Sequence, residues 1–237
     1  MNFPSASPNA AQAAHDILGS VQYQGRKASR QSSEQRRQAI LDAAMRIIVR
    51  DGVRAVRHRA VATEAQVPLS ATTYYFKDID DLISDTFSQF VERSAAQMAE
   101  FWSATQSTLE AMLGRCDGSE QARRQLAEDV AELAVQYVQH QLRERHDHLL
   151  AEQAFLREAL LNPRLRGLAH AHRQILQQGV THFFDVLGSR QPEQDAVLLT
   201  ATIMQMEYQG LLDGVENLDS QAMLAILKRY MNLVLGL

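Results

Sequence analysis

The sequence predicts an all-α protein, and three of its features indicate this fold class. Residues that favour helices, namely Ala, Leu, Gln, Glu and Arg, are common along the chain. Only 5 of the 237 residues are proline, and long stretches contain neither proline nor glycine. Hydrophobic residues make up 46% of the chain, and they recur at the three- and four-residue spacing of a buried helix face.

The first 31 residues differ in composition from the rest. Residues 1–24 are rich in Ser, Ala, Asn and Gln with two prolines, which favours disorder apart from a short helical patch over 10–18. Arg26, Lys27 and Arg30 follow, and such a basic arm can lie along DNA phosphates or enter the minor groove. A solvated tail is the alternative interpretation. We predict a flexible basic arm over residues 1–31.

The first helix is predicted to begin near Ser32 and to end before Gly52. Ser32 with Gln35 can form a capping box, and Gly52 is a typical C-terminal cap. The buried face is marked by Ile40, Leu41, Ala44, Met45, Ile48 and Val49. Four arginines fall largely outside this stripe and are expected at the surface: Arg36, Arg37, Arg46 and Arg50.

Two short helices are predicted next, over residues 58–65 and 69–75. The basic triplet Arg57-His58-Arg59 opens the first, Gln66-Val67-Pro68 separates the two, and hydroxyl side chains are frequent in the second. This is the helix-turn-helix arrangement, in which the second helix enters the DNA major groove while the first crosses the backbone. We therefore predict a DNA-binding domain over residues 32–77.

One face of the second short helix carries the predicted groove contacts. At three- and four-residue spacing, that face presents Ser70, Thr73, Tyr74 and Lys77. Hydroxyl groups donate to phosphates, and Leu69 or the Thr73 methyl group can touch a thymine methyl. Thr72 and Phe76 point toward the core. Of the adjacent tyrosines one is expected to pack, and Tyr74 is favoured as the ring that faces the groove.

An ordered set of residues across 36–82 resembles the DNA-binding domain of the TetR/AcrR family of bacterial transcription regulators. The set consists of Ile40-Leu41-Asp42-Ala43-Ala44, Gly52, Val61-Ala62-Thr63-Glu64-Ala65, Val67, Tyr74, Phe76 and Asp81-Leu82. The family's turn glycine is Gln66 here. The resemblance implies that Arg59 contacts DNA and that His58 touches its backbone. The full set of predicted DNA contacts is Arg26, Lys27, Arg30, Arg57, His58, Arg59, Leu69, Ser70, Thr73, Tyr74, Tyr75 and Lys77.

The distribution of charge separates the two parts of the chain. Residues 1–77 hold 11 Lys or Arg against 5 Asp or Glu, whereas residues 78–237 hold 13 against 23. A basic first third on an acidic remainder indicates that only the first third meets a polyanion. A chance fluctuation of surface charge is the alternative.

Six further helices are predicted after residue 78, which gives about nine in all. They cover 78–113, 119–143, 146–161, 164–187, 193–212 and 220–236, with glycine, proline or asparagine at most of the breaks. The resemblance implies that 78–237 is a ligand-binding and dimerisation domain, with an apolar cavity within 78–187 for a small-molecule effector. Trp102 and Phe155 are its predicted wall residues.

The last two helices are apolar over more than one stripe, although a surface helix needs only one. The excess has to face something, most simply a second copy of the chain. Two helices from each copy would form a four-helix bundle. The predicted interface residues lie seven apart in each helix: Leu199 and Met206, then Leu227 and Val234.

Other classes of site find no support in the sequence. There is no glycine-rich phosphate loop, nucleophile elbow or distinctive carboxylate constellation, so neither an enzyme nor a cofactor is predicted. His146 and His148, like His170 and His172, are two apart and do not share a helix face, so no metal site is predicted. The single Cys116 fits a reducing cytoplasm, and no apolar run is long enough to span a membrane.

The sequence therefore predicts a cytoplasmic, ligand-responsive transcriptional regulator. It would act as a repressor that binds a palindromic double-stranded operator as a homodimer through residues 58–75 and is released by a small molecule. The alternative is a helical small-molecule-binding or protein-interaction module whose basic N-terminus contacts a protein partner. Salt-dependent DNA binding would separate the two, because phosphate contacts weaken steeply as salt rises.

Overall fold

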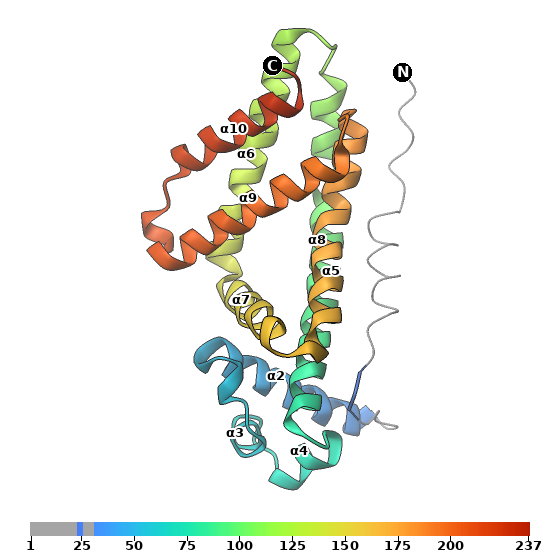
Figure 1. Cartoon of the computed structure of the whole chain (residues 1–237), viewed down its shortest axis with the longest axis vertical. Coiled ribbons are helices and arrows are strands. Elements are labelled where there is room, and N and C mark those ends of the chain that lie inside the picture. Colours follow the sequence, from blue (N-terminus) through green and yellow to red (C-terminus); the bar gives the residue numbers. More distant parts are fainter. Residues whose placement is uncertain (1–22, 26–30) are drawn as a thin grey trace. The chain divides into compact units, whose positions relative to one another are not determined.

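The computed structural model describes residues 23–25 and 31–237, and those residues are helical almost throughout (Figure 1). Over that range there is no strand, which confirms the all-α class. The α-helices are α2 (Gln31–Asp51), α3 (His58–Glu64), α4 (Leu69–Tyr75), α5 (Ile79–Gly114), α6 (Glu120–Glu144), α7 (His146–Leu161), α8 (Arg166–Leu187), α9 (Pro192–Asp213) and α10 (Ser220–Val234). Three 3-10 helices cover Val53–Ala55, Pro163–Leu165 and Val215–Asn217. The predicted arm, including the patch over 10–18, lies outside the described residues.

Helix ends fall where the sequence supplies caps and breakers. Gly52 follows α2 with a φ of 83°, a left-handed conformation that glycine adopts without a steric penalty. Asp78 precedes α5, and its side chain accepts a hydrogen bond from the Asp81 backbone N–H at 2.7 Å. Asp219 does the same for α10 through the Ala222 N–H at 2.9 Å. Most predicted ends are therefore within two residues of the observed ones.

The chain divides into two compact units, and the division falls inside α5, α7 and α8. Among the described residues, the head unit comprises 23–25, 31–95 and 150–173, and the body unit comprises 96–149 and 174–237. The head unit therefore contains α2–α4 together with parts of the longer helices. The functional boundary expected at residues 77 and 78 stays a prediction.

The core of the head unit is built on the predicted stripe of α2. Ile40, Leu41, Ala44 and Ile48 are all buried there. Thr72 and Phe76 are fully buried, as their position on α4 predicts. Phe155 belongs to an aromatic cluster, in which its ring stacks on Phe87 at a centroid distance of 4.3 Å. Phe155 is thus fully enclosed by the packing of its own unit.

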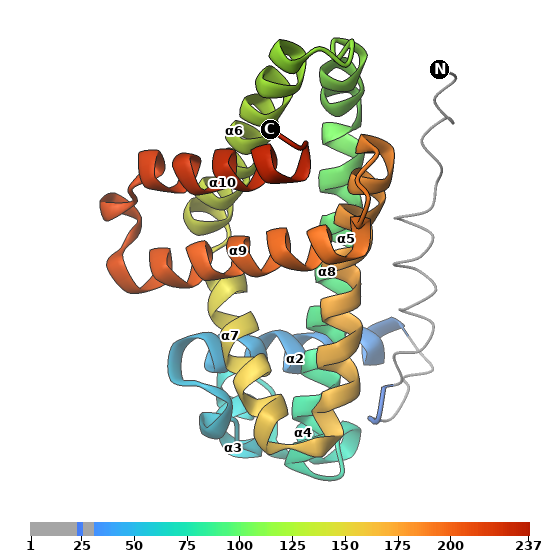
Figure 2. The ribbon, with the colours of Figure 1, turned by 45° about the horizontal axis from the view of Figure 1, so that its top comes forward.

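In the body unit α6 packs against both α9 and α10 (Figure 2). The buried cluster between them includes Leu199, Met206 and Leu227, and Val234 is partly buried against it. Three of the four residues predicted for the dimer interface thus fill the core of the monomer, and an interface at these positions stays a prediction. Each helix does carry a second apolar stripe that is exposed: Leu198, Ala201, Tyr208 and Leu212 on α9, and Ala222, Ile226 and Leu233 on α10.

Trp102 lies in the body unit. Its indole lies against Gly179 of α8, so closely that a side chain at Gly179 would overlap the ring. Phe101, its neighbour, packs edge-on against Tyr137 of α6 at 4.8 Å between ring centroids. Across the described part of the chain, no helix combines the length and apolar character that crossing a membrane requires.

Candidate nucleic-acid interface

The short helices α3 and α4 are joined by a turn that Gln66 makes possible. Gln66 has a φ of 54°, the left-handed region that side chains other than glycine seldom adopt. The turn is closed by backbone hydrogen bonds from Ala65 to Val61 at 2.8 Å and from Val67 to Ala62 at 3.0 Å. Pro68 then precedes α4 in an extended conformation. A glutamine occupies the left-handed position where the resembling family has glycine.

Helix α4 has one buried and one exposed face. Thr72 and Tyr75 lie inward, whereas Ser70, Thr73 and Tyr74 lie outward. Leu69 is 44% exposed and Tyr74 is 54% exposed. Lys77 is also exposed just after the helix. The predicted groove face is therefore on the surface and carries hydroxyl groups, an aromatic ring and a cation.

The two adjacent tyrosines take opposite roles. Their rings meet edge-on at 5.1 Å between centroids. The Tyr75 ring is only 5% exposed, and its hydroxyl shares a 2.7 Å hydrogen bond with Ser33 of α2. Tyr75 is therefore a packing residue that ties the end of α4 to the start of α2, and its ring is not available as a DNA contact. Tyr74 keeps the exposed position that the sequence favoured.

The basic residues around α3 are arranged in two ways. Arg59 and Arg57 are exposed, although Arg57 donates to the carbonyl oxygen of Val56 at 2.8 Å. His58 is half-buried, and its Nδ1 lies 3.2 Å from the hydroxyl of Thr72, so it links α3 to α4. The predicted contacts Arg26, Lys27 and Arg30 lie outside the described residues.

Two other arginines brace α3 against α2 at the surface. Arg46 and Arg50 of α2 donate to the carboxylate of Glu64 at 2.8 and 3.3 Å. These hydrogen bonds lower the pKa of Glu64. Exposed ion pairs contribute little stability. Their main effect is to hold the guanidinium groups of Arg46 and Arg50 against Glu64.

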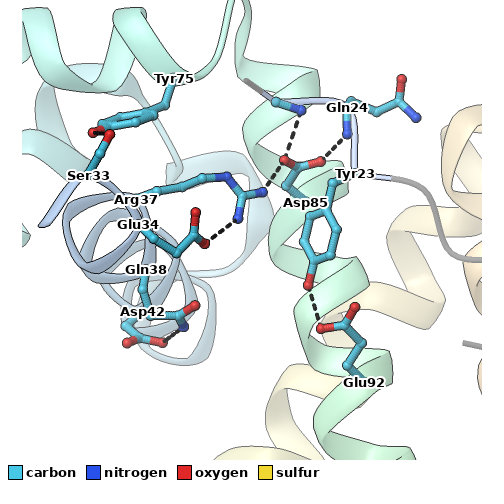
Figure 3. Close-up of polar contacts among 11 residues, drawn as sticks. Tyr23, Gln24, Ser33, Glu34, Arg37, Gln38, Asp42, Tyr75, Asp85 and Glu92 are labelled. Carbon is cyan, nitrogen blue, oxygen red and sulfur yellow. Dashed lines mark hydrogen bonds and ion pairs between the residues drawn. The ribbon is translucent and has the colours of Figure 1, made fainter. Parts of the chain in front are cut away.

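Behind the groove face lies a buried charge pair that the sequence analysis missed. Arg37 was expected at the surface, but it is only 6% exposed and donates to Asp85 of α5 at 2.7 Å (Figure 3). Asp85 is fully buried. The available signal was spacing, because Arg37 lies one turn before the buried Leu41 and Asp85 lies one turn after the buried Leu82.

A second buried pair in the head unit joins His172 of α8 to Glu152 of α7, with Nε2 and Oε1 2.6 Å apart. The His172 ring also contacts the Phe90 ring at a centroid distance of 5.2 Å. Neither of the histidine pairs considered in the sequence forms a cluster with other ligands. In residues 23–25 and 31–237, no group of three His, Cys, Asp or Glu side chains could hold a metal ion.

Comparison with known proteins points to transcription regulators. No family model matches the chain. A 62-residue segment is 36% identical to the nicotine-responsive transcriptional repressor HdnoR of Paenarthrobacter nicotinovorans, and it covers 26% of this chain and 32% of that repressor. The matched region thus spans about a third of the length of that relative.

Solved structures match over most of the chain. A TetR-family protein from Streptomyces coelicolor is 25% identical with a TM-score of 0.58, and the match covers 82% of this chain and 97% of that one. The multidrug binding protein EbrR, solved in complex with ethidium, is 27% identical with a TM-score of 0.58, over 82% and 97% of the respective chains.

Proposed function

Since the chain is a member of the TetR family of regulators, we propose that it is a cytoplasmic, ligand-responsive transcriptional repressor. It binds a palindromic operator as a homodimer through α3 and α4, and a small molecule bound in the region 78–237 releases it. The observation that carries this proposal is the composition of the exposed face of α4.

That face has the chemistry of a DNA-reading surface. The hydroxyl groups of Ser70 and Tyr74 can donate to phosphate oxygens, and the exposed Arg59 can bind a guanine edge or a phosphate. Leu69 and the Thr73 methyl group suit a thymine methyl. Burying Thr72 and Tyr75 on the opposite side holds this face outward.

The exposed stripes of α9 and α10 support the homodimer. Leu198 and Ile226 are 55% and 52% exposed, and Leu212 and Leu233 are 62% and 66% exposed. Four large apolar side chains in these positions favour burial against a second copy, where two-fold symmetry makes the patch self-complementary. In such a dimer the two copies of α4 would have to lie about 34–36 Å apart, or a multiple, to read successive major grooves.

An effector site in the body unit is supported by Trp102. Its indole N–H is buried and has no hydrogen-bond partner in the structure. A buried donor without a partner is costly, so a ligand that offers an acceptor there would be stabilised. HdnoR is named as nicotine-responsive, and EbrR has been solved in complex with imidazole, proflavin and malachite green. We propose a small organic effector for this chain as well.

Recovery of bound fragments from a genomic DNA pool tests the DNA part of the proposal. We expect enrichment of one palindromic sequence, with affinity that falls steeply as salt rises. Enrichment of no sequence, or binding without salt dependence, would contradict it. A protein-interaction module would give that negative result.

The effector part has its own readout because Trp102 is the only tryptophan in the chain. A panel of small organic compounds, beginning with nicotine, can be titrated while the Trp102 emission is followed. We expect a compound that shifts this emission also to release the enriched DNA. Effectors that release DNA without any change at Trp102 would place the site elsewhere.

A further inference from the structure

The short segment Tyr23–Gly25 lies against the end of the recognition helix in the head unit. A Cβ atom added to Gly25 would lie 2.8 Å from Cε1 of Phe76 and 2.6 Å from Oδ2 of Asp85. Phe76 is the residue that ends α4. Distances this short leave no room for a side chain, so glycine is needed for this close approach. The segment therefore packs directly on the structure that presents the groove face.

Asp85 holds the segment by its charge. The backbone N–H of Gln24 donates to Oδ1 at 2.6 Å, and that of Gly25 donates to Oδ2 at 2.9 Å. Arg37 of α2 donates to the same Oδ2 at 2.7 Å (Figure 3). Both oxygens of a fully buried carboxylate are thus satisfied by donors from two other segments.

The guanidinium of Arg37 also contacts the aromatic rings of Tyr23 and Phe76. It lies 4.7 Å from the centre of the Tyr23 ring and 5.7 Å from that of Phe76. The Tyr23 hydroxyl donates to Glu92 at 2.6 Å. Glu92 lies about two helical turns beyond Asp85 on α5. Burial and this hydrogen bond raise the pKa of the Tyr23 hydroxyl, so it remains a proton donor. We call Tyr23, Gln24, Gly25, Arg37, Asp85 and Glu92 the Asp85 clasp.

We propose that Arg37 and Asp85 are positioning residues for operator recognition, and that Tyr23–Gly25 is a working part of the DNA-reading head. This inference rests on the proposed function and extends it to residues that do not touch DNA. The clasp fixes α2, the end of α4 and α5 to one another, and so sets the orientation in which Ser70, Thr73 and Tyr74 meet the bases.

Loss of the clasp has a distinctive consequence for binding. Base contacts depend on the exact placement of side chains, whereas phosphate contacts by Lys and Arg tolerate small displacements. A loosened head therefore loses affinity for its operator while it keeps affinity for random DNA. Simple unfolding would instead lower both affinities together.

Gly25→Ala is the sharpest test, because it adds one methyl group and removes no charge. The matched control is Gly167→Ala, where an added methyl group meets no atom within 4 Å. The probes are a duplex enriched by the wild-type chain from a random library and a random-sequence duplex. We expect Gly25→Ala to weaken operator binding roughly tenfold, about the worth of one base contact, and to change random-DNA binding by less than about twofold.

Two further full-length variants guard against a Gly25→Ala chain that does not fold. Tyr23→Phe removes only the hydrogen bond to Glu92, and Asp85→Asn removes the buried charge. The control for the latter is Asp42→Asn, since Asp42 pairs with Arg93 across the same two helices at 2.6 Å but is only partly buried. We expect Tyr23→Phe and Asp85→Asn to lower the ratio of operator to random-DNA affinity, and Asp42→Asn to leave it unchanged.

The outcomes separate this inference from the proposed function. A wild-type chain that enriches no sequence contradicts the proposed function, and the clasp is then judged by amide hydrogen exchange in α4. That exchange should quicken in Gly25→Ala and not in Gly167→Ala. A wild-type chain that enriches an operator, with clasp variants that bind it equally well or lose both affinities in parallel, overturns the clasp proposal. Unchanged exchange in α4 overturns it as well.

Discussion

The exposed face of α4 and the exposed stripes of α9 and α10 both present large apolar side chains, but their neighbours differ. On α4, Leu69 and Tyr74 lie among hydroxyl groups and cations. On α9 and α10, Leu198 and Ile226 lie on stripes that also carry alanine and leucine. A mixed surface suits a charged, hydrated partner that must be released, whereas an apolar one suits a lasting, dry interface. Exposure alone therefore does not identify a partner.

The largest expected effect comes from charging the apolar stripes. Leu198→Glu combined with Ile226→Glu should convert a dimer to a monomer, because two buried charges per copy would face each other without partners. Operator affinity should fall by roughly 10²-fold or more, since two linked reading heads bind far more tightly than one. Mass in solution and DNA binding check both expectations.

The control for that experiment is Gln174→Glu, which adds charge to an exposed position of α8 in the body unit. It should leave the dimer intact. A wild-type monomer at micromolar concentration would remove the basis of the comparison, and a dimer that survives both glutamates would move the interface to another surface.

The second-largest expected effect is a difference in stability between the buried and the exposed apolar stripes of α9. Leu199→Ala should lower the free energy of unfolding by about 2–5 kcal/mol, because it opens a cavity in the body core. Leu198→Ala, one residue away and 55% exposed, should change the unfolding of the isolated monomer by less than about 0.5 kcal/mol. Urea denaturation of both variants, at protein concentrations low enough for the wild-type chain to be monomeric, measures this difference. Equal losses would mean that the two stripes are not distinct.

The third effect concerns the groove face of α4. Arg59→Ala and Thr73→Ala should each weaken operator binding by about 1–3 kcal/mol, with no change in mass or unfolding. Both side chains are exposed, so their removal costs no packing. Titration of the enriched duplex measures the loss. Wild-type affinity in both variants would show that the reading face is not the one described.

The smallest expected effect is an increase in stability. Gln66→Gly should raise the free energy of unfolding by up to about 1 kcal/mol, because glycine adopts the left-handed conformation of this turn without strain. Operator affinity should remain as in the wild type, since the turn geometry is preserved. A loss of stability on denaturation would mean that the glutamine side chain contributes more than its backbone strain costs.

The parts of the fold that the sequence predicted well depend on local signals. Gly52, Asp78 and Pro192 mark helix ends through their own backbone or capping chemistry, and the α4 faces follow from spacing within seven residues. The failures depend on distant partners. Local spacing places Arg37 one turn from the buried face of α2, but its partner Asp85 lies 48 positions away, and no local pattern pairs the two.

The residues predicted for a dimer interface on α9 and α10 lie in or against the monomer core for a different reason. Both helices carry two apolar stripes, and Leu198 and Leu199 are adjacent in sequence but about 100° apart around the helix. Hydrophobic spacing detects both stripes equally. Only the position of α6 decides which stripe fills the monomer core, and hydrophobic spacing carries no information on that position.

In the proposed dimer, the exposed stripes of α9 and α10 also make the thermal stability of the protein depend on its concentration. A chain that needs its copy to cover Leu212 and Leu233 has a folded state whose thermal midpoint rises with concentration. On dilution these side chains return to water and become available for indiscriminate association. Stocks kept concentrated should therefore outlast dilute ones, and a second, inactive copy of the chain would protect the first.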